Sequence, residues 1–315
     1  MNINNKIFIA GAAGMVGSSL VKMLNKKGYK NIIKPTRQEL DLMNQKSVYD
    51  YLGKHKPDVT IVAAALVGGI LANNKYRADF IFNNLQIQNN VIFGSHLVDV
   101  KTLLFLGSSC VYPKSAKQPM KEEYLLTGPL EYTNEPYAIA KIAGIKLCDS
   151  IKDQFNKNYF SVMPSNLYGL NDNFDPETSH FLPAIIRKIL LAKINKNKEI
   201  IVWGTGSPKR ELLFVDDLAE ACVMLLEKKF NGNLINIGSG TDYSIDQIVK
   251  IVMKVVDYKC NIKYDKTKPD GTMRKILDIS QIEKIGWYAK TNIESGIRLI
   301  LENSEFIKVL KNEKK

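Results

Sequence analysis

The chain has 315 residues, of which 45% are hydrophobic and 24% are charged, and this composition fits one large or two closely packed globular domains. Lys and Arg outnumber Asp and Glu by 44 to 32, but only six are Arg and no long basic block occurs, so we expect a Lys-rich surface and no nucleic-acid partner. The four cysteines lack the spacing of a zinc site or a disulfide framework. Without a signal peptide or an apolar run of about 18 residues, we expect a cytoplasmic protein that does not contact membranes.

Short apolar runs alternate with helical patterns through the first half of the chain. The expected strands are residues 6–10, 31–34, 57–65, 103–106 and 160–163. Apolar residues at helical spacing predict helices at 16–27, 76–98 and 137–155. This alternation predicts an α/β fold with a Rossmann-type doubly wound parallel sheet.

The pattern changes after residue 169. Residues 170–180 are polar and loop-like, and a helix after Pro183, a strand at 199–203 and helices from about Ser244 and Asn292 follow. We expect a first domain of residues 1–169 and about 212–240. A smaller α/β substrate-binding domain is expected at about 170–211 and 241–315.

A glycine motif stands between the first expected strand and helix. Gly11, Gly14 and Gly17 follow the spacing that permits a tight turn and a close approach of backbone to a pyrophosphate. Met15 and Val16 begin the helix, whose amides face the phosphates. The motif predicts a dinucleotide site.

The second expected strand is followed by a cation. An NAD enzyme usually has an acidic residue there for the ribose hydroxyls, whereas this chain has Arg37. A guanidinium fits a 2′-phosphate, so we expect NADPH or NADP as the cofactor. The alternative is a solvated surface charge near Glu39.

A tyrosine and a lysine lie one helical turn apart, at Tyr137 and Lys141. Because a neighbouring cation lowers the pKa of a phenol, we expect Tyr137 to donate a proton to a carbonyl oxygen that accepts hydride. Ser108 follows an expected strand, at the sheet edge where open α/β sheets bind ligands, and its hydroxyl can bind the same oxygen.

Together these residues resemble the extended short-chain dehydrogenase/reductase family. Within that family the chain is similar to enzymes that act on GDP-linked 4-keto sugars, in segments 107–113, 134–141, 163–169, 203–210 and 268–271. The resemblance implies 3,5-epimerisation and C4 reduction of GDP-4-keto-6-deoxy-mannose, with GDP-L-fucose as the product. It also implies a homodimer formed through the helices at 76–98 and 137–155.

The resemblance further implies roles for individual residues. Cys110 and His180 would be the acid and base of the epimerisations, and His180, Asn166 and Leu167 would lie near the nicotinamide. The residues implied for the sugar nucleotide are Lys188, Trp203, Arg210 and Asp270. Some relatives carry a basic residue in the glycine loop, where this chain has Ala12 and Ala13, so the preference for NADPH depends on Arg37.

Alternatives remain open at this point. Cys110 and Trp203 could be core residues, Arg210 could pair with Glu211, and Arg187 could replace Lys188 as the phosphate ligand. The chain could also be a C4 reductase of a related GDP-sugar such as a heptose, with partial or no epimerase activity. A non-catalytic dinucleotide sensor is the more distant alternative.

Overall fold

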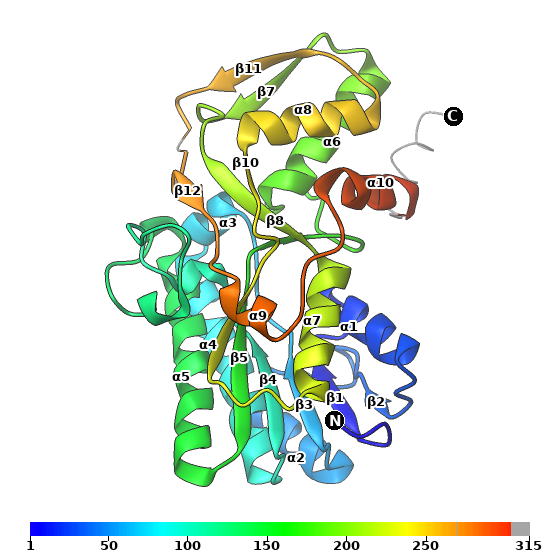
Figure 1. Cartoon of the computed structure of the whole chain (residues 1–315), viewed down its shortest axis with the longest axis vertical. Helices are drawn as coiled ribbons and strands as arrows, with labels where there is room; N and C mark the ends of the chain where they lie inside the picture. Colours follow the sequence, from blue (N-terminus) through cyan, green and yellow to red (C-terminus); the bar gives the residue numbers. More distant parts are fainter. Residues whose placement is uncertain (269, 304–315) are drawn as a thin grey trace.

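The computed structural model describes residues 1–268 and 270–303, and its centre is a six-stranded parallel sheet (Figure 1). In spatial order the strands are β2 (Ile32–Ile33), β1 (Ile7–Ala10), β3 (Val59–Val62), β4 (Thr102–Leu106), β5 (Asn158–Pro164) and β9 (Leu234–Ile237). The chain moves outward from β1 in both directions, and this reversal creates the crevice where doubly wound sheets bind ligands.

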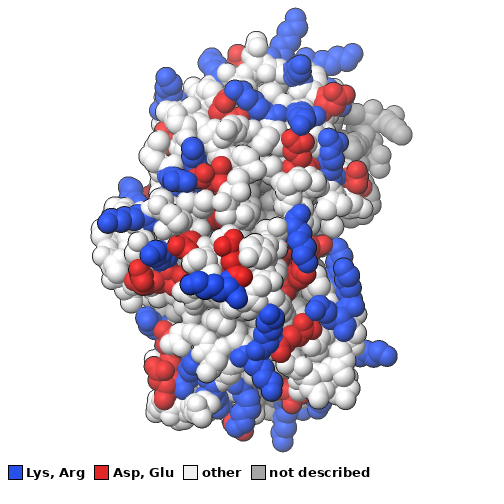
Figure 2. Space-filling model, in the orientation of Figure 1, with Lys and Arg blue, Asp and Glu red and all other residues white. Residues whose placement is uncertain are grey.

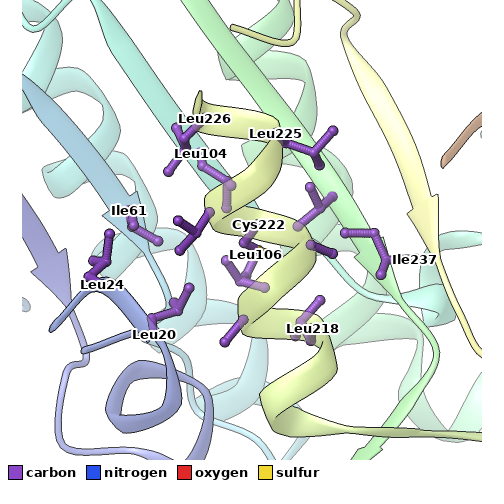
Figure 3. Close-up of a cluster of buried hydrophobic side chains, with 14 of the residues drawn as sticks. Leu20, Leu24, Ile61, Leu104, Leu106, Leu218, Cys222, Leu225, Leu226 and Ile237 are labelled. Atoms are coloured by element: carbon purple, nitrogen blue, oxygen red, sulfur yellow. The ribbon is translucent and has the colours of Figure 1, made fainter. Parts of the chain in front are cut away.

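Helices cover both faces of this sheet. On one face lie α1 (Met15–Lys26) and α7 (Val215–Glu227). Figure 3 shows Leu20 and Leu24 of α1 and Leu218 and Cys222 of α7 in one apolar cluster over the strands. The other face is covered by α2 (Gln45–His55), α4 (Arg77–Leu97) and α5 (Glu135–Phe155). Burial on both faces explains why the central strands are short, mostly apolar runs.

A second, smaller packed unit is built mainly from the later part of the chain. Its helices are α6 (Phe181–Asn195), α8 (Ile245–Val256) and α10 (Ile293–Asn303), which share one apolar cluster. Its strands are β6 (Asn166–Tyr168), β7 (Glu199–Trp203), β8 (Lys209–Phe214), β10 (Asp242–Ser244), β11 (Asn261–Asp265) and β12 (Arg274–Lys275). Strand β8 pairs with β6, β10 and β12, and β7 pairs with β11. The predicted α/β fold class is confirmed.

The packing places one segment differently from the predicted domain division. Ile282 and Trp287 lie in the cluster under the large sheet, although the division assigns residues 241–315 to the smaller domain. The remainder of the division stays a proposal, and its residues 304–315 lie outside the described part of the chain.

Two surface properties bear on partners. Figure 2 shows Lys and Arg spread among Asp and Glu over the visible face, with no continuous basic stripe there. Across residues 1–268 and 270–303, no helix is both long and apolar enough to cross a membrane.

Candidate active site

The glycine motif forms a tight turn from β1 into α1. Gly11 has φ of +84°, a left-handed conformation that favours glycine. A Cβ on Gly17 would lie 2.1 Å from the carbonyl oxygen of Gly11, so only glycine lets helix and turn pack this closely. Gly14 precedes the helix, and Met15 and Val16 begin it. The turn leaves the free amides of the α1 N-terminus beside the strand end, as a pyrophosphate site requires.

Arg37 lies on the exposed loop after β2. Glu39 does not pair with it, because the Glu39 carboxylate accepts a hydrogen bond from the amide of Thr36 at 2.7 Å. Within the described residues Arg37 has neither a hydrogen bond nor an ion pair. Its guanidinium is therefore available to an anion.

Two elements bring the proton-transfer residues together. Ser108 ends the loop after β4 and caps the short 3₁₀ helix at Ser109–Val111. The Oγ of Ser108 accepts a hydrogen bond from the backbone amide of Cys110 at 3.2 Å. From α5, Tyr137 interacts with the hydroxyl of Ser108 and with Cys110. Lys141 lies one turn further along α5, is 3% exposed and donates to the carbonyl oxygen of Leu106 at 2.8 Å.

The protonation states of this pair differ from the expectation. The prediction of a lowered phenol pKa is wrong for this structure: burial and the nearby charge of Cys110 raise the pKa of Tyr137, and the Ser108 hydrogen bond only partly opposes them. Burial lowers the pKa of Lys141 to about 7. The ammonium is 5.8 Å from the centre of the Tyr137 ring and bonds to Leu106 instead of the phenol.

Cys110 meets a cation that the sequence did not suggest. The Nζ of Lys275, in β12, lies 3.1 Å from the Sγ of Cys110, and the side-chain Nδ2 of Asn134 lies 3.5 Å from it. Desolvation acts to raise the pKa of Cys110, but the charge and hydrogen bond of Lys275 and the hydrogen bond of Ser108 outweigh it, and the pKa is lowered. Cys110 is thus a half-buried, polarised thiol and not a core residue.

His180 lies at the N-terminus of α6, after the loop at 170–179. Desolvation and the charge of Lys275 lower the pKa of His180, although the residue keeps exposed surface. One lysine therefore acts on both residues expected to exchange protons with a substrate.

The residues expected at the nucleotide end form two groups. Lys188 of α6 lies 5.5 Å from the ring centre of Trp203, which is 44% exposed at the end of β7 and therefore not a core residue. Arg210 of β8 donates to the carbonyl oxygens of Lys209, Asp270 and Thr272. Glu211 does not pair with it, because that side chain is buried and accepts from backbone amides of Gly240 and Leu277.

Asp270 and Asn166 have structural partners. The Asp270 carboxylate binds the amide of Thr205 at 2.7 Å and its hydroxyl at 2.9 Å, which fixes the turn after Trp203. Asn166 donates to the carbonyl oxygen of Glu211 at 2.8 Å, and Leu167 packs partly buried under the large sheet. Both follow β5 directly, at the carboxyl edge of the sheet.

The structure therefore joins Ser108, Cys110, Tyr137 and Lys141 in one cluster, Lys188 with Trp203, and Arg210 with Asp270. The residue that sequence reasoning missed is Lys275. Its strand has two residues and is defined by pairing with β8, which no local pattern shows.

Comparisons with known proteins identify the family of this chain. A model of the NAD dependent epimerase/dehydratase family matches residues 7–238. GDP-L-fucose synthase 1 of Arabidopsis thaliana is 51% identical over 292 residues, 93% of this chain and 90% of that protein. GDP-L-fucose synthase of Escherichia coli is 46% identical over 313 residues, 95% and 98% of the two chains. A solved GDP-mannoheptose C4 reductase from Campylobacter jejuni with NADP bound has a TM-score of 0.86 at 38% identity, and the match covers 96% of this chain and 98% of that one. This chain belongs to the NAD-dependent epimerase/dehydratase family.

Proposed function

We propose that this protein converts GDP-4-keto-6-deoxy-mannose to GDP-L-fucose by epimerising C3 and C5 and reducing C4 with NADPH. The observation that carries the proposal is the polarised thiol of Cys110 in one cluster with Ser108, Tyr137 and Lys141. A reductase alone needs the serine, tyrosine and lysine, whereas inverting carbon centres needs an additional acid and base. Two relatives named GDP-L-fucose synthase, at 51% and 46% identity, support this substrate.

The residues at the glycine turn fit a dinucleotide. The Cβ positions of Gly11 and Gly17 would fill the turn that backbone amides must line, and the α1 N-terminus opens there. Asn166, Leu167 and His180 would lie beside the nicotinamide, and bound NADPH would supply hydride to C4. Arg37 would bind the 2′-phosphate: Arg37→Ala should weaken NADPH binding by about tenfold or more while leaving NADH binding unchanged, as fluorescence titration can measure.

The epimerisations depend on the ketone at C4, which makes the protons on C3 and C5 acidic. The thiolate of Cys110 would remove such a proton, and the C–H electron pair would move into the C4 carbonyl to give an enolate. A proton returned to the opposite face completes the inversion, and His180 would supply it. The negative charges of the enolate and the diphosphate favour the imidazolium of His180, against the lowering of its pKa in the free protein.

The reduction requires a proton on the C4 oxygen. The raised pKa of Tyr137 keeps its phenol protonated until negative charge develops on that oxygen. Ser108 would hold the oxygen in place. Lys141, one turn away, would stabilise the phenolate that remains.

The sugar nucleotide would lie in the second unit, between the pair Lys188 and Trp203 and the pair Arg210 and Asp270. Arg210 is fixed by backbone carbonyls and forms no ion pair with a carboxylate among the described residues, so its guanidinium is suited to a diphosphate. Lys188 and Lys268 each lie 5.5 Å from the exposed ring of Trp203, so this wall combines an apolar face with positive charge. Asp270 would hold the Trp203 turn through Thr205.

A second candidate is C4 reduction of a GDP-heptose without one or both epimerisations, favoured by the similarity to the solved GDP-mannoheptose C4 reductase. A panel of GDP-4-keto sugars with NADPH and NADH side by side discriminates the two by kcat/KM. Preference for the 6-deoxyhexose, with deuterium from heavy water at C3 and C5, supports the proposal. Preference for a heptose without exchange contradicts it. Turnover of any keto-sugar dismisses the non-catalytic sensor.

We also propose a cytoplasmic homodimer formed through α4 and α5. The two helices pack side by side on one face of the sheet (Figure 1). The exposed residues Phe82, Phe93 and Leu97 recur on α4. The four cysteines, all within the described residues, are free thiols, which fits a reducing compartment.

A further inference from the structure

The cation nearest to Cys110 comes from a distant part of the chain. Lys275 lies in β12, which pairs in parallel with β8 so that Lys275 is the register partner of Arg210. This pairing carries its side chain to the Cys110 loop, where Nζ and Sγ are 3.1 Å apart. At this distance the ammonium of Lys275 donates a hydrogen bond to the sulfur of Cys110.

The other charged and titratable groups that act on Cys110 do not replace this contact. Arg210, on β8, has its guanidinium nitrogens bonded to backbone carbonyls. Glu131 opposes a thiolate, but its carboxylate accepts from the amide and hydroxyl of Thr133. Tyr137, on α5, is a neutral phenol. Lys275 is therefore the one cation in direct contact with the sulfur among the described residues.

We propose that Lys275 is a positioning residue that holds Cys110 as a thiolate and thereby prepares it to act as a base. The role as a base rests on the proposed function, whereas the ion pair itself does not. Desolvation would otherwise keep the thiol protonated, and the net effect of its surroundings is a lowered pKa of Cys110.

Lys275 keeps its positive charge during the proton transfer to Cys110. The thiolate takes a proton from C3 or C5 and becomes a thiol, the C–H electron pair enters the C4 carbonyl, and Lys275 stays an ammonium throughout. The same cation also lowers the pKa of His180, so Lys275 acts on both acid–base residues. Loss of Lys275 would remove this preparation without removing either acid–base group.

The ion pair can be tested without any substrate. The rate of alkylation of Cys110 by iodoacetamide is measured against pH, with the Cys110 peptide followed by mass spectrometry. In Lys275→Met the midpoint should rise by ~1–3 pH units, because a cation within about 4–6 Å shifts a pKa by that amount. Lys275→Arg should keep the midpoint near that of the wild type.

A matched control is Lys209→Met, which removes the same charge from an exposed position on the neighbouring strand. It should leave the midpoint unchanged. An unchanged midpoint in a folded Lys275→Met protein would overturn the ion-pair assignment.

The base role is tested by deuterium exchange at C3 and C5 of the keto-sugar as a function of pH. Lys275→Met should lose about tenfold or more of the exchange rate near pH 7 and recover it at higher pH, with the limb displaced as far as the alkylation midpoint. A loss of the same size at every pH indicates a merely structural role and overturns the proposal. Absence of exchange in the wild type, with a normal alkylation shift, would defeat the proposed function but leave the ion pair intact.

Discussion

At the scale of single residues, burial of Lys141 makes a pH-dependent contribution to stability. Its pKa is about 7 in the folded protein and ~10.4 in an unfolded chain. The unfolded chain therefore binds more protons between these values, and the stability contributed by this residue rises with pH through that window. Lys141→Met has no such charge to bury.

Relative to the wild type, Lys141→Met should therefore gain most in Tm near pH 6.5. The gain should be smaller at pH 9. Circular dichroism melts of the two proteins at both pH values measure this double difference. Loss of the hydrogen bond to Leu106 adds an offset that does not depend on pH. A Tm difference that stays constant with pH would contradict the lowered pKa of Lys141.

Two neighbouring residues should separate the two reactions. Cys110→Ser replaces the polarised thiol with a hydroxyl that is not ionised at neutral pH, so exchange at C3 and C5 should fall ~10²–10⁴-fold. Tyr137→Phe removes the phenolic proton, so NADPH oxidation should fall by a similar factor while exchange continues. Mass spectrometry of the sugar and NADPH absorbance read the two separately. Equal loss of both activities in both variants would argue against separate roles.

At the scale of elements, the turn from β1 into α1 allows a test of cofactor binding. Gly17→Ala would place a methyl group 2.1 Å from the Gly11 carbonyl oxygen, so the turn must open and its amides move. We expect NADPH affinity to fall by at least tenfold in a titration followed by fluorescence, with a lower Tm. Gly53→Ala is the control, because no atom lies within 4 Å of the added methyl group in α2. It should bind NADPH normally and be more stable by ~0.5–1 kcal/mol.

The elements also show what sequence patterns could reveal. The central strands were predicted because parallel strands buried on both faces must be short apolar runs. Strand β8 was missed because it begins with the charged residues Lys209, Arg210 and Glu211, which do not form an apolar run. Pairing with β6, β10 and β12, which are distant in the sequence, stabilises this strand. Cys110 was found through a local motif, whereas its partner Lys275 is 165 positions away and reaches it through β12.

At the scale of the whole molecule, the candidate site forms where the large sheet meets the second, smaller unit. Cys110 and Tyr137 follow or flank strands of the large sheet, while Lys275 and Arg210 come from the small one. Glu211 of β8 links the two units, because its buried carboxylate accepts hydrogen bonds from the backbone amides of Gly240, after β9, and Leu277, after β12. On the face in Figure 2, Lys and Arg are mixed with Asp and Glu, so the net charge of +12 is not concentrated at one place there.

The exposed face of α4 carries a prediction about assembly. Phe82, Phe93 and Leu97 are 62%, 41% and 55% exposed and recur at the spacing of one helical face, an arrangement typical of an interface. We expect a dimer by light scattering at micromolar concentration, and Phe82→Asp should convert it to a monomer, because a buried unpaired carboxylate is costly. Tyr288→Asp, which changes an aromatic residue that is 59% exposed outside α4, should remain a dimer. A Phe82→Asp protein that is still dimeric would place the interface elsewhere, and a monomeric wild type would refute the dimer itself.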